Sequence, residues 1–133
     1  MKSSPTRLER VSARFVEAMT RAFPRATQTA TWSGLPRFSI APLVPEFGPL
    51  VVEVEPDAEL TLVVGTLMHT HFGGASAVDE LIATCRKLLE DELVIAVFAG
   101  GASMSPREYV DFTADAAFWV WSGRVDPRRF STE

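Results

Sequence analysis

Hydrophobic positions recur at helical spacing in two parts of the chain. In each part apolar residues return every three or four positions, which indicates a helix with one apolar face. The first helix is predicted within residues 1–24, starting at Ser4-Pro5 and ending at Pro24. Serine is a favoured N-cap, and proline suits the first helical position. The two stripes consist of Leu8, Val11, Phe15, Ala18, Met19 and Ala22, and of Val78, Leu81, Ile82, Cys85, Leu88 and Leu89.

Three segments before the second helix and three after it have the composition of strands. Prolines within and around the first of them predict an edge strand, and residues 25–34 before it are predicted as loop. Gly65 predicts a bulge or bend inside the third segment, which is long for one strand and follows a hairpin turn at "PDA". The fourth is continuously apolar, as in a central strand covered on both faces. The last two are predicted to form a closing hairpin, followed by a polar tail over 124–133. The six segments are 37–44, 50–55, 59–72, 93–99, 107–112 and 117–122.

The order of these elements predicts an α+β fold. The chain reads α-β-β-β-α-β-β-β, and its 133 residues are the length of a single globular domain, 1–133. A helix between the third and fourth strands favours a right-handed parallel crossover. We therefore expect a two-layer sandwich of two helices on a mixed, mostly antiparallel sheet of five or six strands.

Charge and cysteine content narrow the functional classes. The formal charge is −4, with +4 in residues 1–25 and −8 in the rest. A nucleic-acid-binding domain is expected to be basic overall, so no nucleic-acid partner is predicted. The basic segment is compatible with an organelle transit peptide, but a surface helix with a solvated basic flank explains it as well. The single cysteine excludes an intrachain disulfide and favours the reducing cytoplasm. No apolar run has the roughly 20 residues of a membrane span, so no membrane partner is predicted.

The stretch "LMHTHFGGASAVD" (67–79) contains a candidate metal site. His69 and His71 alternate along a strand and share a face, so both imidazoles could reach one zinc ion. With Ser76 and Asp79 this pattern resembles the JAMM metalloproteases, which remove ubiquitin-like modifiers. Phe72 stands where that family has proline, and the spacer here is shorter. The resemblance implies zinc held by the two histidines and Asp79, with Ser76 stabilising the oxyanion.

A structural interpretation explains the same residues without a metal. Ser76 and Asp79 have the spacing of a capping box, in which the serine hydroxyl accepts the backbone N–H of Asp79. The Gly73-Gly74 pair is then the turn between strand and helix. A phosphate site at this turn is disfavoured, because the stretch lacks the lysine of a P-loop. We favour the cap over the zinc site.

Acidic and aromatic residues indicate a binding surface instead. Glu53, Glu55, Asp57 and Glu59 lie within seven residues and would attract a basic partner. Trp119 and Trp121 share a strand face, where core packing is the expected role and an interface anchor the alternative.

Without a complete catalytic set, we expect a non-catalytic protein-binding module of the inhibitor or immunity type, with no cofactor. The alternative is a zinc-dependent hydrolase. Either is compatible with a homo-oligomer.

Overall fold

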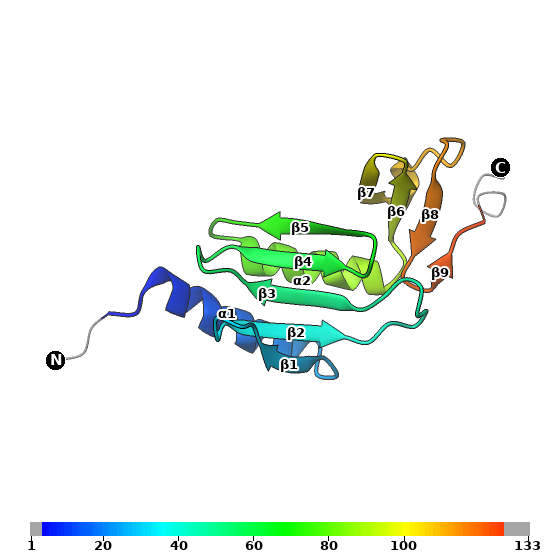
Figure 1. Cartoon of the computed structure of the whole chain (residues 1–133). Coiled ribbons are helices and arrows are strands. Elements are labelled where there is room, and N and C mark those ends of the chain that lie inside the picture. The colour runs from blue at the N-terminus through cyan, green and yellow to red at the C-terminus, as the bar shows by residue number, and fades with distance from the viewer. Residues whose placement is uncertain (1–3, 127–133) are drawn as a thin grey trace.

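Two α-helices and two antiparallel sheets form the described part of the chain. The computed structural model describes residues 4–126. A five-stranded sheet has both helices on one face, and a four-stranded sheet lies beside one end of it (Figure 1). The predicted α+β class with helices on an antiparallel sheet is thereby confirmed. The predicted parallel crossover is wrong, because the strand after the second helix starts the second sheet and pairs only with antiparallel neighbours.

Helix α1 spans Arg7–Ala22 and begins with a capping box. The Thr6 hydroxyl accepts the Glu9 backbone N–H at 3.1 Å, and the Glu9 carboxylate accepts the Thr6 N–H at 2.8 Å. The helix therefore starts two residues later than Ser4-Pro5 predicts, because this pair satisfies two end N–H groups at once. It ends before Pro24, as predicted. Phe15 and Met19 anchor it to the sheet.

Helix α2 spans Ala77–Leu89 and presents the predicted apolar face to the core. Val78, Leu81, Ile82, Cys85 and Leu88 are buried. Burial raises the pKa of the Cys85 thiol to about 12, because an apolar interior disfavours the thiolate. This cysteine is therefore a packing residue.

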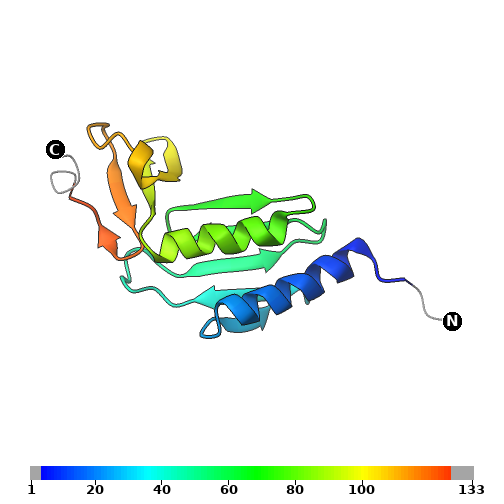
Figure 2. The same cartoon turned by 180° about the vertical axis from the view of Figure 1, so that it is seen from behind.

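The five-stranded sheet is a meander in which each strand pairs with the next along the chain. Leu50, Val52 and Val54 alternate with less buried residues, which is the pattern of a sheet covered on one face. The two helices cover that face, as Figure 2 shows. The strands are β1 (Thr27–Ala30), β2 (Pro36–Ile40), β3 (Leu50–Val54), β4 (Leu60–Val64) and β5 (Met68–Phe72).

Three predictions for this sheet are wrong. The segment 59–72 is two strands and not one: the chain bends at Gly65, as one of the two predicted alternatives has it, but the bend is a full turn with φ +55° that separates the strands. The predicted loop at 25–34 contains strand β1, whose four residues are all exposed and so lack a hydrophobic signal. Because β1 pairs with β2, the latter is an inner strand. The turn at "PDA" is confirmed, since it joins the antiparallel strands β3 and β4.

The four-stranded sheet is built around β6 (Leu93–Phe98), which pairs with β7 (Gly101–Pro106) and with β8 (Ala117–Val120). Leu93 and Ile95 of β6 pack in the main core. Val94 and Ala96, which alternate with them, pack in a second apolar cluster with Phe118 and Val120. The prediction of a strand covered on both faces is therefore confirmed.

The predicted closing hairpin is wrong. Residues 107–109 form a 3₁₀ turn, and β8 pairs with β6 and with the short β9 (Gly123–Arg124). Of the predicted polar tail, Arg124 lies in β9 and Val125 is buried, because it joins the second cluster. Residues 127–133 of that tail lie outside the described residues. Within residues 4–126, neither helix has the length and apolarity to cross a membrane.

Candidate functional site

One face of the five-stranded sheet is not covered by the helices. Leu60, Leu62 and Val64 of β4 point toward the helices and are fully buried. Because side chains alternate across a strand, the residues between them point to the other side. The uncovered face therefore carries Thr27, Thr29, Arg37, Ser39, Val51, Glu53, Thr61, Val63, His69 and His71. It is predominantly polar, which suits contact with water or with a partner.

A first hollow of about 480 Å³ lies over β2 and β3 on this face. Trp32, Arg37, Glu53 and Glu55 contribute to its lining. Trp32 occupies the turn between β1 and β2, and its side chain is 98% exposed. Gly34, at φ +82°, helps to close that turn. A large aromatic side chain without packing in its own fold is available to a partner.

A second hollow of about 470 Å³ adjoins the first and shares Glu55 and Pro56 with it. Asp57, Glu59 and His71 stand on its rim. The turn that carries the acidic residues is fixed: the Asp57 carboxylate accepts the Glu59 N–H at 3.0 Å, and the Glu55 N–H donates to the Glu59 carbonyl at 2.8 Å. The structure therefore gathers the predicted acidic residues around two connected hollows.

Carboxylates dominate the electrostatics of this face. Burial raises the pKa of the Glu53 carboxyl above its usual value, and the neighbouring Glu55 raises it further. Arg37 opposes the shift from 3.9 Å, across the β2–β3 pairing. Arg37 therefore offsets only part of the repulsion between Glu53 and Glu55, and a cation from a partner would offset more of it.

The histidine pair lies at the edge of the same face. The rings of His69 and His71 are 5.2 Å apart, as expected for alternate residues of β5. Nδ1 of His71 is 3.0 Å from the hydroxyl of Thr61, which is a buried polar side chain. The imidazole of His71 is therefore oriented by a neighbouring strand.

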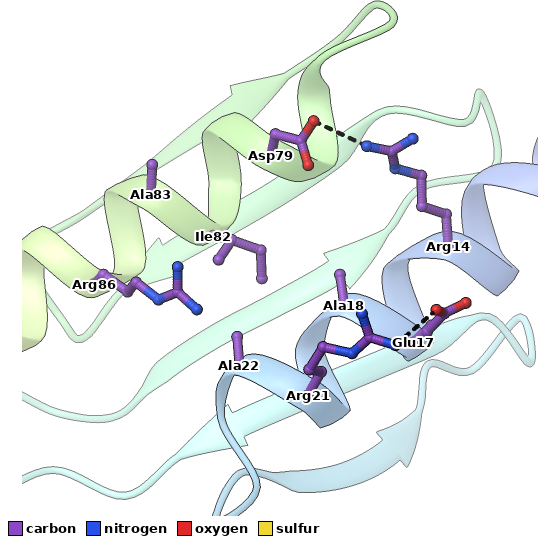
Figure 3. Close-up of a pocket in the computed structure, with 9 residues that line it drawn as sticks. All are labelled: Arg14, Glu17, Ala18, Arg21, Ala22, Asp79, Ile82, Ala83 and Arg86. Carbon is purple, nitrogen blue, oxygen red and sulfur yellow. Dashed lines mark hydrogen bonds and ion pairs between the residues drawn. The ribbon is translucent and has the colours of Figure 1, made fainter.

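The structure does not bring the predicted third zinc ligand to these histidines. Asp79 lies on α2, on the helix side of the sheet, where its carboxylate forms an ion pair with Arg14 at 2.9 Å (Figure 3). Between residues 4 and 126, no group of three potential metal ligands comes together. Ser76 is the N-cap of α2, but its side chain makes no capping hydrogen bond. The predicted capping box is therefore wrong: the Ser76 backbone, at φ −101° and ψ 12°, lacks the extended conformation of a capping serine, and the Asp79 carboxylate pairs with Arg14 instead.

The two predicted tryptophans pack inside the molecule. Trp121 is 3% exposed, and the centre of its ring lies 5.2 Å from that of Phe47. Trp119 is half-buried. The centre of its ring lies 6.4 Å from that of Phe47 and 5.9 Å from the guanidinium carbon of Arg124. Neither lines the two hollows; the expected core role is confirmed for Trp121, while Trp119 is partly buried against the same core. The most exposed of the aromatic residues that the structure describes is Trp32, whose sequence signal was its position in a short polar turn, "TWSG".

Comparison of the chain with protein-family models, with curated proteins and with solved structures found no match in any of the three.

Proposed function

We propose that the chain is a non-catalytic protein-binding module that holds a basic segment of its partner on the uncovered sheet face. The observation that carries this proposal is the pair of connected hollows, with four carboxylates around them and an exposed tryptophan at one end. An extended basic segment could place its cationic side chains among Glu53, Glu55, Asp57 and Glu59. Trp32 would add an apolar and cation–π contact.

Charge complementarity of this kind accelerates association and discriminates between partners. It suits an inhibitor or immunity-type protein that must find and neutralise a basic target. The zinc-hydrolase alternative is not proposed, because Asp79 and the two histidines lie on opposite sides of the sheet.

An affinity capture from the native host with quantitative mass spectrometry tests the proposal. The first test bait carries Glu55→Gln and Asp57→Asn, which remove two charges with little change in shape. Its control carries Glu80→Gln and Glu90→Gln on the helix side, with the same loss of charge. A second test bait, Trp32→Ala, is matched by Tyr109→Ala, which changes a second exposed aromatic residue, in the 3₁₀ turn that follows β7.

We expect a stoichiometric basic partner that wild type and both controls retain. Each test variant should lose at least about 90% of it, since hot-spot residues dominate interface energies. Retention should also fall as salt is raised. Equal recovery with all baits, or a partner lost only with the controls, would contradict the proposal.

A further inference from the structure

A groove of about 560 Å³ runs between α1 and α2 on the helix side of the molecule. Small side chains of the two helices, Ala18, Ala22 and Ala83, leave the space open, and Ile82 adds an apolar surface (Figure 3). A volume of this size suits a small molecule. The groove lies away from the uncovered sheet face, so binding here is independent of the proposed function.

Three arginines line the groove from two different helices. Arg14 and Arg21 come from α1 and Arg86 comes from α2. Two carboxylates partly compensate them: Asp79 pairs with Arg14 at 2.9 Å, and Glu17 pairs with Arg21 at 3.3 Å. All four paired side chains are more than half exposed. Such pairs contribute little free energy and exchange readily with another anion.

Arg86 is the cation that these pairs leave uncompensated. No acidic group lies within ion-pair distance of its guanidinium among residues 4–126. Glu90 is one helical turn away, at the spacing at which arginine and glutamate commonly pair. The side chain of Arg86 instead extends along the groove beneath Ile82 (Figure 3). Its donors are therefore available to a ligand in the groove.

We propose that this groove binds a small ligand with a phosphate group on an apolar body. Arg86 contacts the phosphate, and Arg21 and Arg14 can turn from their carboxylates to share it. A phosphate dianion offers several acceptors to more than one planar guanidinium, and it outcompetes the single charge of Glu17 or Asp79. The apolar body of the ligand lies over the alanines and Ile82, where it displaces water.

Phenyl phosphate tests the assignment, because it combines a small apolar ring with a phosphate. It is titrated into ¹⁵N-labelled protein while the backbone amides and the arginine Nε–Hε signals are followed by NMR. Saturable shifts are expected at Arg86, Ala83 and Ala22. Arg86→Gln should weaken binding at least about tenfold, since it removes a charged hydrogen-bond donor. Lys87→Gln removes the same charge from the next position of α2 and should change affinity less than about twofold.

Three probes separate the parts of the ligand. Phenol, without the anion, should produce no saturable shift, and inorganic phosphate should bind more weakly than phenyl phosphate. Phenylacetate carries a carboxylate on a similar body and should also bind more weakly. Equal affinity for phenylacetate, equal weakening by the two substitutions, or shifts that do not saturate would each overturn the proposal.

Discussion

Gly65 offers a sharp test of how the two sheets are joined. It lies in the turn between β4 and β5 with φ +55°, and its N–H donates to the Pro49 carbonyl at 2.9 Å. A Cβ added here would lie 1.7 Å from the carbonyl oxygen of Phe47. Phe47 is fully buried, and its ring packs against Trp119 of β8 and Trp121 in the turn after it. The carbonyl oxygen of Phe47 therefore cannot move away without disturbing the packing between the two sheets.

The cost of Gly65→Ala has two parts. An alanine in the left-handed region costs about 1 kcal/mol. Displacement of a well-packed neighbour adds about 1–3 kcal/mol. We therefore expect a loss of about 2–4 kcal/mol from a total stability on the order of 5–15 kcal/mol.

Gly34→Ala is the matched control. Gly34 has φ +82°, but nothing lies within 4 Å of the position of its Cβ. Only the conformational cost of about 1 kcal/mol applies there. Both substitutions restrict the unfolded chain equally, so the difference between them isolates the contact with Phe47.

Equilibrium urea unfolding, followed by circular dichroism, measures both variants. The Gly65 variant should be less stable than the Gly34 variant by about 1–3 kcal/mol with an unchanged m-value. A difference below about 0.5 kcal/mol, the usual size of a neutral surface change, would refute the reasoning.

Three further outcomes follow from the local structure. Thr6→Ala should lower the free energy of unfolding by about 1 kcal/mol, because it removes a capping box. Ser76→Ala should lower it by less than half as much, because the Ser76 side chain makes no capping hydrogen bond. Thermal unfolding measures both variants, and equal losses would contradict the described start of α2. The Cys85 thiol, with a pKa of about 12, should react with Ellman's reagent only after unfolding, and rapid reaction of native protein would show that it is accessible. The pKa of the Glu53 carboxyl is higher in the folded protein than its ordinary value of 4.5. Ionisation of Glu53 therefore lowers the stability of the fold as the pH rises through this folded-state pKa. Glu53→Gln should therefore raise Tm at about pH 7 and lose this gain at about pH 4, and a gain at both would exclude ionisation as the cause.

The elements with a strong periodic signal were predictable from the sequence. The stripe of α2 and the alternation in β3 specify both their type and their buried face, because burial selects apolar residues at the matching period. The continuous apolar run of β6 correctly indicated cover on both faces. Strand β1 could not be found this way, because none of its residues contributes to the core.

Pairing and long-range contacts were not predictable. Gly65 is compatible with a bulge or a turn, and only the neighbouring carbonyl of Phe47 shows which applies. Asp79 has the spacing of a cap residue. Its carboxylate instead pairs with Arg14, which lies 65 positions away in the sequence. For the candidate site, the acidic residues were found by their density in the sequence. The exposure of Trp32 depends on what surrounds it in space.

Hydrogen–deuterium exchange of the chain, alone and saturated with the captured partner, tests the central claim most directly. Protection is expected in the turn at 31–34 and across residues 53–61, where the two hollows lie. Exchange in α1 and α2 should stay unchanged. Protection confined to the helices or to the second sheet would contradict binding on the uncovered face.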